Sequence, residues 1–475
     1  MKMTKRILAG VCALTLCSGL AACGGKNGKK DGAAQQANMN DDQVARIEAI
    51  ADSLPDKQLA NTEVKWLAHY DFNPGDGQAE NPGLHIFQTK YGGSVKYISS
   101  TWDNRYTDLA KYVMASDSPD FFPASDMDGF PKGAIKAMFE PIDDYIDLDS
   151  DLWSQVKNSN DQFIFNGSHY VAAIKSAPNF VCVYNKKTME DNGFDDPAEL
   201  YWNDQWTFSK FSEMCISFTD ADADKYGLDG YWYGKALNDT CGTPLIGLEN
   251  GKLVNNMDKP EIEKVQNLMY DLQKNNVVFD RSSNGWDTRG NGETGNGLGS
   301  YLTLFIPVGL WGIENTPENT ALFGDVDAGE IMFVPMPRLD DSDTYYVSAR
   351  IEGYFLCKGA PNPEGFATLM DCLLAADKEA SEIGEEQLVE VDHWNDEMIE
   401  MRREVYRLVE EHPVYDFEYG VSAELSQNMD TVNQATMITG GDPSTWTSTV
   451  QEWKGTIDYL IKEANDNIQT EPTAD

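Results

Sequence analysis

Apolar and polar positions follow two patterns that alternate along most of the chain. Short apolar runs are typical of buried strands, and apolar residues at helical spacing are typical of amphipathic helices. The runs predict strands at Val64–Ala68, Ser94–Ile98, Val181–Tyr184, Tyr301–Ile306, Ile331–Val334 and Tyr354–Cys357. The helical spacing predicts helices at Thr107–Ala115, Glu261–Lys274 and Phe366–Ala376. Strands that alternate with helices predict an α/β fold with a mostly parallel sheet.

Both ends of the chain depart from this alternation. Val44, Ile47 and Ile50 recur between polar residues, which predicts a short helix at 41–54. Near the other end, one series of spaced apolar residues predicts a long helix and a second series predicts another. The first series is Trp394, Met398, Met401, Val405 and Leu408, and the second is Trp446, Val450, Trp453, Ile457 and Leu460.

The first 23 residues have the order of an export signal with a lipoprotein box. Lys2, Lys5 and Arg6 precede the apolar run Ile7–Leu20, and the small residues Ala21 and Ala22 precede Cys23. Cleavage before Cys23 would free it for lipid attachment, so we expect residues 1–22 to be a signal peptide. The alternative is an ordinary secretory signal with a chance cysteine. No later apolar run reaches the roughly 20 residues that a spanning helix needs.

The expected location is therefore the outer face of the cytoplasmic membrane, with the protein held there by lipid on Cys23. Residues 24–40 are rich in Gly, Lys, Asn and Gln and offer little to bury. We expect them to form a flexible tether.

Charge narrows the set of partners. The chain has 78 acidic and 37 basic residues and a formal net charge of -41. Such a surface repels phosphate backbones and anionic headgroups, which argues against nucleic-acid binding and against charge-driven membrane docking. The five cysteines after Cys23 are too few and too scattered for a disulfide framework, so at most two bridges could form. Cys182, Cys357 and Cys372 stand in apolar runs, which predicts that they are buried.

Sequence motifs typical of catalytic or metal-binding sites are missing or only partly matched. The five histidines are scattered, and no His-Glu-x-x-His, Cys-x-x-Cys or Gly-x-Ser-x-Gly occurs. Gly290–Gly295 has dinucleotide-type glycine spacing but follows a polar stretch, so a loop is favoured. Asp220–Asp224 begins like a calcium loop, yet Lys225 and Tyr231 stand where Gly and Glu are needed, so a turn is favoured. We expect no metal, no cofactor and no catalytic residue.

An ordered set of short motifs resembles the family 1 extracellular solute-binding proteins, the maltose-binding-like receptors of ATP-binding-cassette importers. The resemblance covers about 64–376, and the C-terminal helices match only loosely. The motifs are Asp117-Ser-Pro-Asp120-Phe-Phe, Glu140-Pro-Ile-Asp-Asp-Tyr-Ile, Phe165-Asn-Gly-Ser-His-Tyr170, Val183-Tyr-Asn-Lys186, Gly193-Phe-Asp-Asp-Pro197, Trp206-Thr-Phe-Ser-Lys-Phe211, Lys225-Tyr-Gly-Leu228 and Phe333-Val-Pro-Met-Pro337.

The resemblance implies a type II periplasmic-binding-protein-like fold, with two α/β lobes joined by hinge crossings and with C-terminal helices. By similarity, the chain crosses near 176–178 and again near 334–337. The expected organisation is a lipidated cysteine, tether and short helix at 23–60, lobe 1 at 61–175 and 338–377, lobe 2 at 178–333, and C-terminal helices at 378–475, mainly in lobe 2.

Candidate ligand-binding residues follow from strand ends and from the resemblance. Open α/β sheets bind ligands beyond the carboxyl ends of their strands, and a sugar offers a C–H face to aromatic rings and hydroxyls to polar groups. Asp126 matches a position where the family often places a sugar-binding acid, and Trp311 resembles the Trp of the family's Gly-x-Trp segment. The full set is Trp311, Asp126, Asp71, Tyr70, Asn179, Trp232, Tyr233 and Trp446. Core packing is the alternative for each tryptophan.

The function that the resemblance implies is capture of a sugar or oligosaccharide and its delivery to a membrane permease and its ATPase. The receptor is expected to act as a monomer and not as an enzyme. Two alternatives stay open: a surface-anchored polysaccharide hydrolase or lyase that uses paired carboxylates, and a sensory or adhesive lipoprotein. Peptides, polyamines and metal chelates also remain possible ligands, since only the supply of aromatic residues favours sugars. The acidic stretch Glu379–Glu411 has no close counterpart in the maltose receptor.

Overall fold

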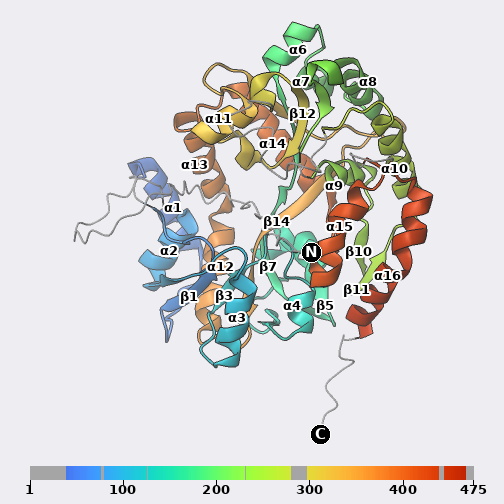
Figure 1. Ribbon diagram of the computed structural model, residues 1–475. Helices are drawn as coiled ribbons and strands as arrows, with labels where there is room; N and C mark the ends of the chain where they lie inside the picture. Colours follow the sequence, from blue (N-terminus) through green and yellow to red (C-terminus); the bar gives the residue numbers. More distant parts are fainter. Residues whose placement is uncertain are drawn as a thin grey trace, which may run out of the picture. The chain divides into compact units, whose positions relative to one another are not determined.

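The computed structural model describes residues 39–75, 80–125, 127–230, 232–279, 297–437 and 443–466 (Figure 1). The expected signal peptide 1–22, Cys23, most of the expected tether, the candidate Asp126 and the loop Gly290–Gly295 lie outside these ranges. The chain divides into two compact units. Unit 1 contains Met1–Asp126, Gly133–Lys175 and Ile351–Gln387, and unit 2 contains Met127–Lys132, Ser176–Arg350 and Leu388–Asp475.

Unit 1 is built on a mixed sheet. Strand β1 (Glu63–Ala68) lies between β2 (Ser94–Ser99) and β3 (Phe121–Pro123), and both pair with it in parallel. Strand β14 (Val347–Cys357) pairs with β3 in the antiparallel direction. β4 (Phe139–Glu140) and β7 (Val171–Pro178) also pair with β14, and β5 (Ile164–Phe165) pairs with β6 (Ser168–His169). The helices are α1 (Asp41–Ser53), α2 (Pro82–Tyr91), α3 (Arg105–Met114), α5 (Lys157–Asn160), α12 (Pro363–Ala375) and α13 (Asp377–Glu390), with α4 (Lys132–Ile135) beginning at the unit boundary.

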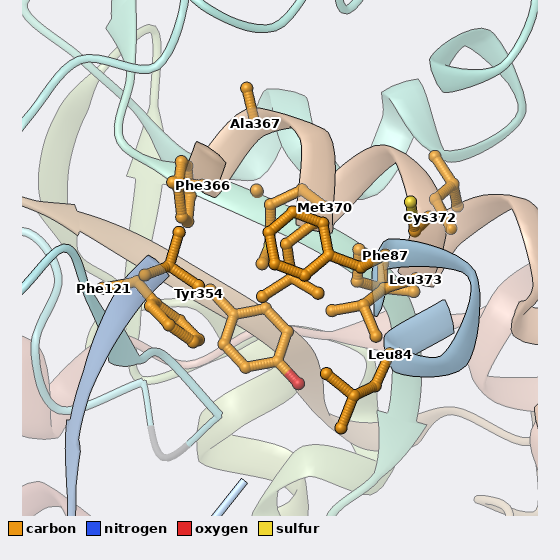
Figure 2. Packing of buried hydrophobic residues seen from close by; sticks show 14 of the residues in the cluster. Leu84, Phe87, Phe121, Tyr354, Phe366, Ala367, Met370, Cys372 and Leu373 are labelled. Carbon is orange, nitrogen blue, oxygen red and sulfur yellow. The ribbon is translucent and has the colours of Figure 1, made fainter. Parts of the chain in front are cut away.

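The core of unit 1 lies where α2 and α12 pack together. Figure 2 shows apolar side chains from α2, β3, β14 and α12 pointing toward one another. Each helix has a proline in its first turn and an asparagine cap, Asn81 for α2 and Asn362 for α12. The helices approach closely at Gly83, where an added Cβ would lie 2.6 Å from the Cα of Leu373. Glycine is therefore required at this contact.

A buried carboxylate joins the sheet to α12. Asp120 accepts hydrogen bonds from the backbone N–H of Lys65 (2.7 Å) and of Asn362 (2.6 Å). Burial raises the pKa of the Asp120 carboxyl, although these two hydrogen bonds oppose the rise. The Asn362 side chain donates in turn to the carbonyls of Asn61 and Glu63. Asp120, the second acid of the Asp117–Asp120 motif, thus has a structural role.

Helix α1 packs into the core of unit 1. Ile47 on α1 is fully buried in that core. Arg46 donates two hydrogen bonds to Glu379 on α13, at 2.8 and 2.6 Å, and Gln43 donates to Glu386 at 2.7 Å. The helix expected at 41–54 forms as α1, and it packs against α13 through these polar contacts.

Unit 2 is built on a second mixed sheet with the strand order β13-β8-β12-β9. These strands are Ile331–Val334, Val181–Asn185, Thr303–Val308 and Tyr226–Leu228. β8 is antiparallel to β13 and β12, and β12 is parallel to β9. β10 (Ile246–Glu249) and β11 (Lys252–Asn255) form a hairpin, and β15 (Pro413–Val414) pairs with the start of β14. The helices are α6 (Lys186–Asn192), α7 (Pro197–Trp202), α8 (Phe208–Phe218), α9 (Tyr233–Asn238), α10 (Pro260–Gln273), α11 (Pro317–Phe323), α14 (Asp396–Glu411), α15 (Ala423–Gln434) and α16 (Trp446–Asp466).

Most of the expected elements are present. All six expected strands and all three interior helices form, with β12 beginning two residues later than expected and β14 extending back to Val347. The expectation of a mostly parallel sheet is wrong. β14 enters its sheet only after the chain has passed through unit 2, so no βαβ crossover fixes its direction, and it runs antiparallel to β3 and β4. β8 runs antiparallel to both β12 and β13.

The return of the chain to unit 1 begins at Ile351, whereas the expected return segment began at 338. Residues 338–350 group with unit 2 because their contacts lie there. The Arg338 guanidinium donates to the Asp204 carboxylate (3.2 and 3.1 Å), and the Tyr345 hydroxyl donates to the Trp206 carbonyl (3.0 Å). The identity of these units as hinged lobes stays a prediction.

Candidate functional site

One edge of the unit 2 sheet gathers aromatic side chains. Because β12 is parallel to β9 and antiparallel to β8, the carboxyl ends of β9 and β12 and the start of β8 share this edge. Trp232 follows β9, Trp311 follows β12, and Phe180 precedes β8. We call Phe180, Trp232 and Trp311 the aromatic corner.

The rings of the aromatic corner contact one another. The centroids of Trp232 and Trp311 are 6.4 Å apart and their planes are perpendicular, at 88°. Phe180 stacks on Trp232 at 6.0 Å and 29°. Phe180 is only 6% exposed, whereas both indoles are partly exposed. The phenyl ring therefore supports the indole of Trp232, and both indoles keep part of their surface exposed.

Local packing fixes Trp311. It belongs to a short 3₁₀ helix, Leu310–Ile313, directly after Gly309. A Cβ at Gly309 would lie 2.6 Å from the Trp311 ring, so the position has no room for a side chain. The Asn319 side chain donates to the carbonyls of Trp311 (3.1 Å) and Glu314 (3.0 Å). The loop is thus held from both sides.

Polar residues lie close in sequence to the aromatic corner: Asn179 precedes Phe180, and Glu314 follows Trp311 by three residues. Asn179 is partly exposed, and its backbone N–H donates to the carbonyl of Ser348 (2.8 Å). Burial, with a contribution from Asp392, raises the pKa of Glu314 to about 7. Asp392 accepts from the backbone N–H of Asn315 (2.9 Å), and burial raises its pKa as well.

Two other candidates of unit 2 lie in its core. The hydroxyl of Tyr233 donates to the Met437 carbonyl (3.3 Å), and the ring is buried. Trp446 is 1% exposed, and its indole N–H donates to the Met257 carbonyl (3.1 Å). Both side chains pack in the protein interior, so we leave them out of the proposed ligand set.

A buried charge cluster follows Trp232 along the chain. Trp232 precedes α9, and Lys235 lies in the first turn of that helix. The Lys235 ammonium is 3.2 Å from Asp239, 3.5 Å from Asp416 and 3.8 Å from Glu418, and all four side chains are buried. Three carboxyl groups thus face one lysine.

The balance of charge in this cluster shifts its pKa values. Burial opposes the charge of Lys235, but the three carboxylates prevail and its pKa rises. Burial raises the pKa of Asp239 to about 6 and that of Glu418 to about 8, against the opposing effect of Lys235. Asp416 accepts backbone hydrogen bonds from Leu245 (2.7 Å) and Glu418 (2.9 Å). Burial thus favours a protonated carboxyl group in this cluster, and it does so most strongly at Glu418.

The carboxyl ends of the parallel strands in unit 1 carry a second group of candidates. Tyr70 and Asp71 follow β1. Tyr70 is partly buried, and its ring meets the Trp66 ring edge-on at 5.5 Å. Asp71 is exposed and accepts from the backbone N–H (3.0 Å) and the side chain (2.9 Å) of Asn73. Asp126 lies outside the described residues.

Comparison with models of known protein families shows which family has this architecture. The model of the bacterial extracellular solute-binding proteins matches residues 75–380. The chain belongs to this family. Its fold is the type II periplasmic-binding-like fold with additional C-terminal helices. A search of curated protein sequences gave no match.

Solved structures of other solute-binding proteins share this fold. A cyclo/maltodextrin-binding protein complexed with maltotetraose has 17% identity and a TM-score of 0.56, over 88% of this chain and 99% of that chain. A substrate-binding protein of Listeria monocytogenes in complex with cycloalternan has 16% identity and a TM-score of 0.54, over 86% and 97%. The GacH receptor of Streptomyces glaucescens, solved unliganded and with acarbose, has 13% identity and a TM-score of 0.57, over 84% and 98%.

The described residues of this solute-binding protein give three further findings. Within them, no helix combines the length and apolar character needed to cross a bilayer. The same residues contain no grouping of three or more His, Cys, Asp or Glu side chains suited to a metal ion. All five described cysteines are free, and Cys182, Cys357 and Cys372 are buried as expected.

Sequence reasoning missed two aromatic residues at these strand ends. Phe180 lies directly before β8, two residues after the crossing expected near 176–178, and Trp102 follows β2. Trp102 could have been found by the rule that selected Tyr70, because it follows the carboxyl end of a correctly predicted strand, whereas Phe180 precedes its strand and falls outside that rule. Trp102 was hidden by the polar residues Ser99–Thr101 that separate it from the apolar run.

Proposed function

We propose that this protein is the lipid-anchored, extracytoplasmic receptor of an ATP-binding-cassette importer and that it captures a sugar or oligosaccharide. Membership of the solute-binding family supports the receptor role. The aromatic corner is the observation that carries the choice of ligand. Two partly exposed indoles at a right angle offer one face to the C–H surface of a sugar ring and a second face to its edge.

Polar partners complete this proposed site. The Asn179 amide can both donate to and accept from sugar hydroxyls. From unit 1 we propose Tyr70, Asp71 and Asp126 as further contacts, on the strength of their positions after β1 and β3. The ligands named for the maltotetraose and cycloalternan complexes are consistent with an oligosaccharide.

Binding would be a reversible closure of two lobes that breaks no bond in the ligand. The proposed lobes are units 1 and 2, and β7 and β14 carry the chain from one unit to the other. The loaded receptor would then deliver its ligand to a permease and its ATPase. The export signal and Cys23 support a lipid anchor at the outer face of the cytoplasmic membrane.

Calorimetry on the full chain, purified in detergent, tests the binding function. The probes are maltotetraose, cycloalternan, acarbose, D-galactose and D-mannitol. We expect saturable binding of at least one of them and, by chromatography, recovery of that ligand intact. Release of shorter sugars would instead support an enzyme.

Substitution in the aromatic corner tests the site. Trp311→Ala is expected to weaken binding by about 10-fold or more, since large aromatic contacts dominate such interfaces. The matched control is Trp202→Ala, because Trp202 is 48% exposed at the end of α7, outside the aromatic corner. Equal affinity in both variants would contradict the proposed site.

A further inference from the structure

Trp102 in unit 1 provides a second aromatic surface, outside the aromatic corner. It lies between the carboxyl end of β2 and the start of α3, and it is partly exposed. Its ring meets the His69 ring edge-on, with centroids 5.1 Å apart and planes at 85°. His69 directly follows β1, which is parallel to β2. Trp102 therefore lies at the edge of the sheet where this fold binds ligands.

A buried arginine holds Trp102. Arg105, the first residue of α3, is 4% exposed. The centre of its guanidinium group lies 3.6 Å from the centroid of the Trp102 ring, and an Nη1–H group donates to the Trp102 carbonyl. The same guanidinium is 4.9 Å from the centroid of Tyr106. Guanidinium groups stack on aromatic faces, and this one contacts the ring and the backbone of the same residue.

This contact has a consequence for binding. A side chain that is already fixed loses little conformational freedom when a ligand arrives. An unsupported, partly exposed indole would have several rotamers to lose. The Arg105 contact thus favours a preorganised indole surface.

The contact also bears on the charge of the ligand. A protein with a net charge of -41 attracts cations, and exposed indoles bind cations through their faces. The guanidinium of Arg105 already occupies one face of Trp102. A second cation on the opposite face would be repelled at short range. A neutral ring with C–H groups meets no such repulsion.

We propose that Trp102 is a ligand-stacking side chain of unit 1, that Arg105 is its positioning residue, and that together they select an uncharged sugar over a cationic solute. The proposal rests on the proposed function. It adds a contact outside the aromatic corner, and it removes polyamines and quaternary amines from the possible ligands.

The test measures the affinity of the full chain for the panel sugar that wild type binds, and for spermidine and choline. Trp102→Ala is expected to weaken sugar binding about 10- to 100-fold, and Trp102→Phe by less than about 5-fold. Arg105→Met is expected to cost about 5- to 20-fold, with partial rescue in Arg105→Lys, which keeps the charge but not the planar group. Trp202→Ala is the matched control.

A double-mutant cycle separates positioning from general stability. If Arg105 acts through Trp102, Arg105→Met should change affinity by no more than about 2-fold in a chain that already carries Trp102→Ala. A full additive loss there would overturn the positioning role. Thermal melts without ligand identify any variant that is not folded, and Arg105→Lys then carries the comparison.

The other outcomes are distinct. Sugar binding that is lost in Trp311→Ala but unchanged in Trp102→Ala would overturn this inference and leave the proposed function in place. Binding of spermidine or choline that depends on Trp102 would overturn the selection for an uncharged ligand. Failure of wild type to bind any sugar of the panel would overturn the proposed function, and this inference with it.

Discussion

The buried charge cluster of unit 2 predicts how stability depends on pH. Glu418 has a pKa of about 8 in the folded protein, raised from 4.5 chiefly by burial. Between these values the folded state holds a proton that the unfolded state has lost. The contribution of Glu418 to the free energy of unfolding is therefore fully present below pH 4.5 and is lost as the pH rises toward about 8.

The size of this effect follows from the shift. One pKa unit corresponds to about 1.4 kcal/mol, so a span of about 3.5 units gives roughly 5 kcal/mol in total. Glu418→Gln removes the ionisation and keeps an oxygen that can accept from Asn433, which now donates at 3.1 and 2.9 Å. We expect the variant to match wild type within about 1 kcal/mol at pH 5 and to exceed it by up to about 4 kcal/mol at pH 8.

Urea unfolding followed by tryptophan fluorescence at pH 5, 6, 7 and 8 measures this difference. Glu452→Gln on α16 is the matched control, because Glu452 is exposed, and it should leave the dependence on pH unchanged. A difference between Glu418→Gln and wild type that stays constant from pH 5 to pH 8 would refute the reasoning.

Three further substitutions test the fold and the anchor. Asp120→Ala should lower the free energy of unfolding by about 2–4 kcal/mol, measured by urea denaturation, because it leaves two buried N–H groups without their acceptor. Gly83→Ala should lower the midpoint of thermal unfolding, at a cost of about 1–3 kcal/mol, because the new methyl group meets the Leu373 backbone. Cys23→Ser should move the protein from the membrane fraction to the soluble fraction on immunoblots; retention in the membrane would count against lipid anchoring.

The sequence predicted best those elements whose apolar pattern is compatible with only one kind of secondary structure. Ile331–Val334 is apolar throughout and forms a fully buried strand with these bounds. The first half of β14 was missed because Arg350 and Glu352 interrupt the apolar pattern. Strand direction was harder to predict, since it depends on where the chain re-enters a sheet and not on local pattern.

The candidate site was predicted in part for similar reasons. The resemblance to the family's Gly-x-Trp segment led to Trp311, and Trp232 was proposed because it lies just past the Lys225-Tyr-Gly-Leu228 motif. The two rings contact each other in the aromatic corner. Residue type alone suggested Trp446, but its N–H finds the Met257 carbonyl in the core. Sequence alone does not distinguish an indole at a strand end from one at the buried start of a helix.

The packing of α1 bears on how mechanical load would enter the molecule. The chain between the proposed lipid and the rest of the protein leads first into α1, and the salt bridge between Arg46 and Glu379 fastens that helix to unit 1. Tension from the membrane would therefore be borne by unit 1. Unit 2 is connected to the proposed anchor only through the chain of unit 1. In the proposed ligand capture, unit 2 would therefore move without load from the tether.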